Sequence, residues 1–118
     1  MTNPMRGQVE ITLGEDTYNC RLTIDSLIKI EDELNDGILQ LAQKIANADV
    51  RLKTLVTVLR YALRGGGNDV SDGDVQKIIS NVGLVVASTQ VAHLLAATLS
   101  DSKSEEKSEG KSEKVAQS

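Results

Sequence analysis

The segment Leu52–Gly67, with the sequence LKTLVTVLRYALRGGG, combines the clearest helix pattern in the chain with its clearest stop. Apolar residues recur in it at steps of three and four, which places them on one face of a helix. They are Leu52, Leu55, Val56, Leu59 and Leu63. Arg60 and Arg64 lie in the last turn, where positive charge favours the negative end of the helix dipole. Gly65, Gly66 and Gly67 follow, and glycine accepts the left-handed angles that end a helix. We predict that this helix forms the centre of the core.

Two short runs upstream alternate apolar and polar residues, which is the pattern of half-buried strands. The apolar positions are Val9, Ile11 and Leu13 in the first run and Tyr18, Cys20 and Leu22 in the second. Gly14-Glu15-Asp16 lies between the runs and is typical of a turn. The pattern predicts a β-hairpin with one apolar face. Because a lone hairpin is marginally stable in water, we expect that face to pack on helices.

Two helices are expected between the hairpin and the central helix. Thr23 is a predicted N-cap of the first, and Leu22 and Leu27 have the spacing of a hydrophobic staple. Asn35-Asp36-Gly37 is a stop signal, and a second helix is expected over residues 38–46. The predicted stripe of the first helix is Ile24, Leu27, Ile28, Glu31 and Leu34. Asp49 is the expected cap of the central helix.

Two more helices are expected after the glycines. Ser71 and Asp74 have capping-box spacing, and Val70 and Val75 again have staple spacing. The helix that they open ends near residues 81–83. The last helix, over residues 84–99, is apolar on most sides. Such a helix is either central in the fold or meets another chain.

The fold class is therefore α+β and mostly α, with an N-terminal β-hairpin packed on a bundle of four to five short helices. Residues 1–99 form the expected single domain. Residues 101–114 include no apolar side chain, and residues 100–118 are predicted to be a disordered charged tail. The chain has no Trp and no Phe, so the core must be aliphatic.

Composition argues against several classes of partner. The net charge of −4 and the scarcity of aromatic residues argue against binding to nucleic acid. Cys20 is the single cysteine and cannot form an internal disulfide, which fits a reducing compartment. The segment 84–99 is shorter than the roughly 20 residues of a membrane span. We expect a soluble cytoplasmic protein that uses neither membrane nor nucleic acid.

The sequence contains no convincing catalytic, cofactor or metal site. The acidic cluster at 68–74 lacks the ligand spacing of a calcium loop, and helix capping accounts for it. The glycines follow a helix and lack the lysine of a phosphate-binding loop. His93 and Cys20 are the weak candidates for a catalytic dyad, and neither has a recognisable partner. Glu31 is a candidate ion-pair partner for Arg60 or Arg64. We expect a protein that is not an enzyme and has no cofactor.

The order of these pieces resembles a known family. The relevant segments are Arg6-Gly7-Gln8-Val9, Leu22-Thr23-Ile24, Ile30–Leu34, Leu59–Gly67 and the Ser71-Asp72 cap. They resemble the small tail protein of gene transfer agents and related siphophages, a family labelled tail tube protein and grouped with phage tail assembly chaperones. Its most specific part is the arginine-glycine segment with Arg60, Arg64, Gly65, Gly66 and Gly67. The resemblance extends to about Leu99, and the charged tail departs from it.

The resemblance implies a non-enzymatic assembly factor in the cytoplasm of a bacterial host. It would bind the long helical tape-measure protein before the tail tube polymerises, and the tube protein is a further implied partner. Apolarity, rather than a family motif, suggests the contact residues on exposed parts of the last helix: Val91, Leu94, Leu95 and Thr98. The formation of a homo-oligomer is left open by the sequence.

Two other functions remain open at this point. One is a structural tail protein retained in the particle, although a tube ring usually needs a larger β-sheet than one hairpin. The other is a small regulatory binding module, although no basic helix for DNA is evident.

Overall fold

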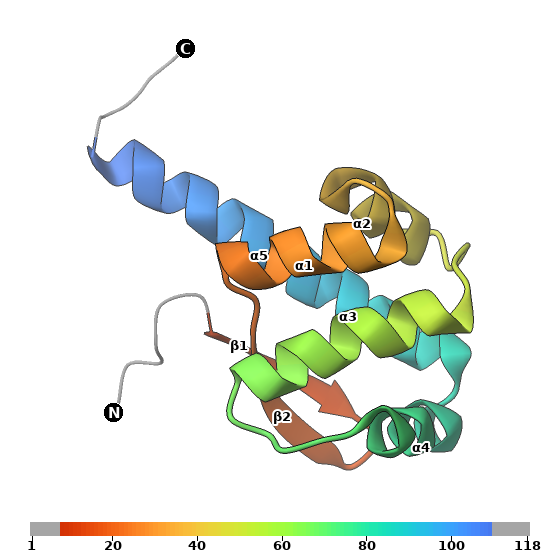
Figure 1. The fold of residues 1–118 in the computed structure, drawn as a ribbon. Helices are drawn as coiled ribbons and strands as arrows, with labels where there is room; N and C mark the ends of the chain where they lie inside the picture. The colour runs from red at the N-terminus through yellow and green to blue at the C-terminus, as the bar shows by residue number, and fades with distance from the viewer. Residues whose placement is uncertain (1–7, 110–118) are drawn as a thin grey trace.

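The computed structural model describes the backbone of residues 8–109 and the side chains of residues 8–100. A hairpin of β1 (Gln8–Leu13) and β2 (Asp16–Arg21) precedes all of the helices (Figure 1). The helices are α1 (Ile24–Leu34), α2 (Ile38–Ala46), α3 (Leu52–Gly65), α4 (Asp72–Val82) and α5 (Leu84–Glu109). The predicted fold class, mostly helical with an N-terminal hairpin, is confirmed.

The hairpin has a two-residue loop because Leu13 pairs with Asp16 in the antiparallel ladder. Gly14 has a φ of +71°, a conformation that glycine adopts without steric cost. β1 packs against α5 and β2 packs against α3, which buries Ile11 and Cys20. The backbone N–H of Thr12 also donates to the side-chain oxygen of Gln90 on α5 at 3.1 Å. The apolar face thus lies on helices, as predicted.

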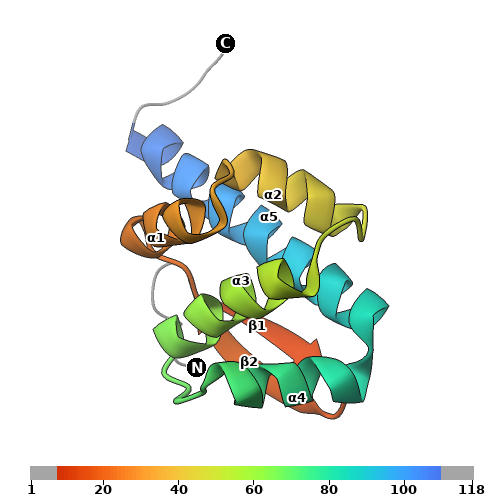
Figure 2. The same ribbon diagram turned by 45° about the vertical axis from the view of Figure 1, so that its right-hand side comes forward.

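Helix α3 lies at the centre of the domain, in contact with β2, α1, α4 and α5 (Figure 2). Its buried face is wider than the predicted stripe because it is covered from several sides. The buried residues are Leu55, Thr57, Val58, Leu59, Ala62 and Leu63. Leu52 was predicted on this face, but it begins the helix and is 57% exposed.

Most of the predicted helix boundaries are confirmed. The hydroxyl of Thr23 accepts a hydrogen bond from the N–H of Ser26, and Asn35 ends α1 in the left-handed conformation. Ser71 and Asp74 form the predicted capping box of α4. The expectation for Asp49 is wrong, because Arg51 occupies the N-cap of α3 and makes no side-chain capping bond.

Helix α1 buries a narrower face than its sequence suggests. Leu27 and Ile30 are buried, whereas Ile24 and Ile28 are 63% and 51% exposed. The buried face of α1 therefore differs from the predicted stripe by a rotation about the helix axis. The reason is that α1 packs against α2 and α3 and its outer side is not covered. Ile30, which was outside the predicted stripe, is the core residue.

Helix α5 is central and contacts β1, α2, α3 and α4. Val91, Leu94, Leu95 and Thr98 are all at most 3% exposed, so the expectation that they lie on an exposed surface is wrong. Their apolar character is explained by the domain's own core. The backbone continues as a helix beyond the expected end at Leu99, to Glu109, and residues 110–118 of the predicted tail lie outside the described residues.

Among the described residues, no single helix is long and apolar enough to cross a membrane. Helix α4 and the segment Leu84–Ser100 pass that test of length and composition only together, as a pair bent by 114°. Gly83, with a φ of +95°, makes this corner between the two helices.

Candidate functional site

The glycines after α3 allow two backbones to approach closely. A Cβ atom on Gly65 would overlap the carbonyl oxygen of Arg21, and one on Gly66 would overlap the carbonyl group of Asn19. Gly67 has open space around it and a φ of +98°. The end of α3 is thus set directly on β2, and the glycines do more than stop the helix.

Arg60 connects three helices. Its guanidinium donates to Asp72 at the start of α4 at 2.6 Å and lies 3.2 Å from a carboxylate oxygen of Glu33 on α1. The Tyr61 hydroxyl donates to the same oxygen of Glu33 at 3.1 Å. The Arg60 side chain is only 14% exposed. Hydrogen bonds to Asp72, together with the charge of both carboxylates, raise the pKa of Arg60, so it is a permanent cation here.

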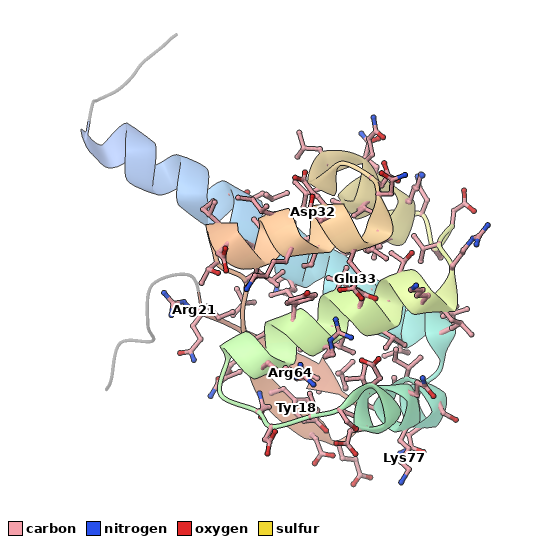
Figure 3. The ribbon with its side chains drawn as sticks, viewed as in Figure 1. Tyr18, Arg21, Asp32, Glu33, Arg64 and Lys77 are labelled. Carbon is pink, nitrogen blue, oxygen red and sulfur yellow. The ribbon has the colours of Figure 1, made fainter. Side chains whose placement is uncertain are left out.

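The predicted ion pair of Glu31 with an arginine is wrong, because the partner of Arg60 on α1 is the carboxylate two residues further along the helix. Glu31 instead accepts a hydrogen bond from the backbone N–H of Ile38 at 2.8 Å, at the start of α2. Glu33 projects from α1 toward α3 (Figure 3) and supplies the carboxylate. Glu33 lies one helical turn after the buried Ile30, so the side of α1 that packs on the domain also carries the carboxylate that binds Arg60.

Arg64 and Asn68 hold the loop between α3 and α4. The Arg64 Nε donates to the carbonyl oxygen of Val70 at 2.8 Å. The Asn68 side-chain amide donates to the carbonyl oxygens of Asn19 on β2 and Leu63 on α3. The arginine-glycine segment is therefore a structural junction, in which each polar member ties α3 to another part of the domain.

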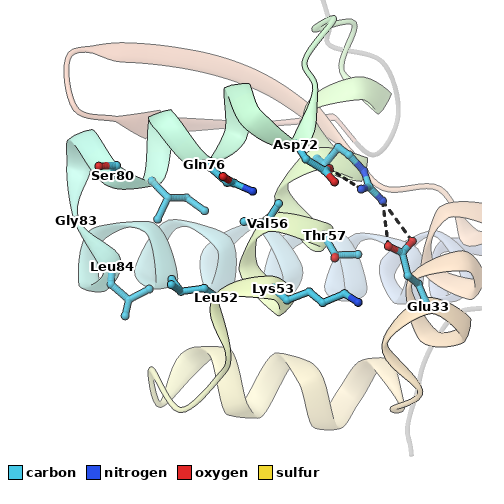
Figure 4. A pocket seen from close by; sticks show the side chains of 12 residues that line it. Glu33, Leu52, Lys53, Val56, Thr57, Asp72, Gln76, Ser80, Gly83 and Leu84 are labelled. Carbon is cyan, nitrogen blue, oxygen red and sulfur yellow. Dashed lines mark hydrogen bonds and ion pairs between the residues drawn. The ribbon is translucent and has the colours of Figure 1, made fainter.

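A groove of about 790 Å³ runs between α3 and α4 (Figure 4). We call it the α3–α4 groove. Its lining residues are Glu33, Leu52, Lys53, Val56, Thr57, Arg60, Asp72, Gln76, Ile79, Ser80, Gly83 and Leu84. The ion pairs of Arg60 occupy one end, and Leu52 and Leu84 lie toward the other (Figure 4).

The leucine end of the α3–α4 groove presents apolar surface to solvent. Leu52 is 57% exposed and Leu84 is 44% exposed, and Val56 and Ile79 lie beneath as more deeply buried residues. Val85 and Val86 continue the exposed apolar surface along the first turn of α5. Sequence reasoning missed this surface because Leu52 and Leu84 belong to helices far apart in the chain. The one sequence feature that Leu52 and Leu84 share is that each is an apolar residue at the first position of its helix.

The candidate catalytic residues are not arranged for catalysis. Cys20 is fully buried, and burial raises the pKa of its thiol to about 12, so the reactive thiolate is absent near neutral pH. His93 is exposed on α5. Within residues 8–100, no group of three or more His, Cys, Asp or Glu side chains is placed to hold a metal ion. The acidic loop residues Asp72 and Asp74 instead serve Arg60 and the α4 cap.

The described residues form a small, mostly helical domain with a groove between two of its helices. Residues 6–101 match the family described as phage tail tube protein, GTA-gp10. This match covers nearly the whole described domain, and the chain belongs to that family of phage and gene-transfer-agent tail proteins. The resemblance seen in the sequence is thereby confirmed. No curated protein and no solved structure shows significant similarity to the chain.

Proposed function

We propose that this protein is a tail assembly chaperone that binds the tape-measure protein before the tail tube polymerises and is then released. The observation that carries the proposal is the solvent-exposed apolar surface of the α3–α4 groove, with Leu52 and Leu84 at its mouth. A tape-measure protein is long and helical, and an amphipathic helix binds such a groove through its apolar face. The proposed role is non-enzymatic and cytoplasmic.

The proposed release needs no chemical step. A single groove of this size would bind one helical segment with modest affinity. Many copies along one tape measure would nevertheless cover it, because binding sites on one chain raise the effective concentration of the others. Polymerisation of the tube around the tape measure would then displace the copies one by one. The tube protein itself is a second proposed partner at that stage.

A structural tail protein is the second candidate, and the description of the family as a tail tube protein favours it. The described domain has only a two-stranded sheet. A tube ring joins subunits through a larger β-structure, so this candidate needs strands contributed by other chains.

The experiment is co-expression with the product of the longest tail gene of the same element. Under the chaperone proposal, that product stays soluble and co-purifies with this protein, whereas it aggregates when expressed alone. Quantitative mass spectrometry of finished particles then separates the candidates. Absence from particles supports the chaperone, and presence at the stoichiometry of the tube rings supports the structural protein. Failure to co-purify, together with absence from particles, would overturn both.

A further inference from the structure

We propose that the α3–α4 groove is the docking site for an amphipathic helix that carries a carboxylate next to its apolar stripe. The inference rests on the proposed function, since it names the surface and the chemistry by which the tape-measure protein would be recognised. The exposed apolar surface comes mainly from α3 and the start of α5, because the one apolar side chain that α4 contributes is only 6% exposed. Leu52 and Val56 come from α3, and Ile79 belongs to α4. Leu84 adds the first residue of α5 at the open end.

The shape of the groove favours a helix. Two helices form its walls, and Val56 and Ile79 are more deeply buried than Leu52 and Leu84. An incoming helix can therefore place apolar residues at positions i, i+3 or i+4, and i+7 against this stripe. Gln76 and Ser80 on α4 line the same groove (Figure 4) and can hydrogen-bond polar groups at the edge of the ligand.

The arrangement of charges in the groove favours a carboxylate at one position of the ligand. Its two carboxylates, Glu33 and Asp72, are both bound by Arg60. Lys53 lies along the groove between Leu52 and Glu33 (Figure 4) and makes no hydrogen bond or ion pair within residues 8–100. The four charged side chains of the lining sum to zero, because Lys53 and Arg60 balance Glu33 and Asp72, and Lys53 is the one of the four without an ion-pair partner among residues 8–100. A carboxylate next to the apolar stripe of the ligand would pair with Lys53.

Binding is tested with fluorescent peptides that cover the helical segments of the longest tail gene product, measured by anisotropy against the full-length protein. Amphipathic segments with a carboxylate next to the apolar stripe are expected to bind, and more weakly as salt increases. Leu52→Asp should reduce the affinity about tenfold or more, because it puts a charge in the apolar stripe. Lys53→Glu should also weaken binding and should be rescued by a peptide whose facing Glu is changed to Lys.

Leu39→Asp is the matched control. Leu39 is a 67% exposed leucine in the first turn of α2, outside the groove, as Leu52 is a 57% exposed leucine in the first turn of α3. Aspartate is favourable in the first turn of a helix, so both variants should fold. Leu39→Asp is expected to bind like the wild type.

The position of the bound peptide is tested with a dye on an introduced cysteine. Native Cys20 is buried and should not react, so it can remain in the protein. A dye at Ser80→Cys, in the groove, should respond to peptide. A dye at Lys77→Cys, which points away from the groove on the outer side of α4 (Figure 3), should not.

Several results would overturn the inference. One is equal binding by Leu52→Asp and the wild type, and another is equal loss by Leu52→Asp and Leu39→Asp. A wild-type dimer that Leu52→Asp converts to a monomer would show that the groove holds a second copy of this chain. If the full-length tail product co-purifies but no peptide needs the groove, the chaperone function stands and this docking site is wrong. If the tail product does not co-purify at all, the proposed function fails first.

Discussion

Gly66 is the residue whose identity is most strictly set by its surroundings. Any side chain there would overlap the backbone of Asn19 and Cys20 on β2. We expect Gly66→Ala to lower the free energy of unfolding by about 3 kcal/mol or more, because two backbone segments must move apart. Urea denaturation measures the loss. Gly37→Ala, where a Cβ meets nothing within 4 Å, should have a small effect. Similar losses in the two variants would contradict the close approach.

Cys20 should not react with thiol reagents in the folded protein. Its thiol is buried and has a pKa raised to about 12 from an ordinary value of 9.0. Because the folded state keeps the thiol neutral where the unfolded chain ionises it, this contribution to stability is present below pH 9 and is lost as the pH rises toward about 12. A thiol reagent should react in urea and not in buffer. The alkaline loss of stability should be smaller in Cys20→Ala, and fast reaction of the native thiol would contradict this placement.

At the scale of elements, Arg60 holds α1, α3 and α4 together. Arg60→Met should reduce the free energy of unfolding by about 1–2 kcal/mol, a modest value because Glu33 and Asp72 are partly exposed and screened by solvent. Arg60→Lys should retain only part of this free energy. An ammonium group lacks the planar donor fork with which the guanidinium binds both carboxylates. Denaturant titrations of both variants, with Glu33→Gln and Asp72→Asn for double-mutant cycles, measure the coupling. Full stability in Arg60→Met would show that the network has no structural role.

The capping box of α4 gives an acid-dependent contribution. Hydrogen bonds from the backbone and hydroxyl of Ser71 lower the pKa of Asp74. A lowered folded-state pKa means that this stabilisation is present above the ordinary value of 3.8 and is lost as the pH falls through the folded value. The stability difference between wild type and Asp74→Asn should therefore shrink on acidification below about pH 4. Asp69→Asn, outside the box, is the control. A difference that does not vary with pH would contradict the assignment.

Local signals predicted the elements well, and contacts distant in sequence explain the errors. The caps at Thr23 and Ser71 depend on neighbouring residues only, so the sequence was sufficient to predict them. The choice of Glu33 over Glu31 depends on where α3 lies beside α1, which a helical pattern does not contain. The buried state of Leu94 and Leu95 was missed because apolarity alone does not distinguish a core from an interface. The groove was missed because α3 and α4 form it only after folding.

At the scale of the whole molecule, the first and last described elements depend on each other. β1 packs against α5, and the α5 residues Val91, Leu94 and Leu95 are fully buried in the common core. A chain that ends at Gly83 should therefore fail to fold, because the hairpin and α3 lose the helix that covers them. Circular dichroism and the dispersion of amide NMR signals test this. Native-like dispersion in the shortened chain would contradict the central place of α5.

The same packing has a consequence for the timing of folding in the cell. The hairpin leaves the ribosome first, but its apolar face is covered by α5, which is made last among the described elements. Ile11 and Leu13 therefore stay exposed on the nascent chain until most of the domain has been translated. Folding of the domain is thus expected to occur in a single late step, after α5 has left the ribosome, and a slowly translated or truncated chain would be exposed to proteolysis.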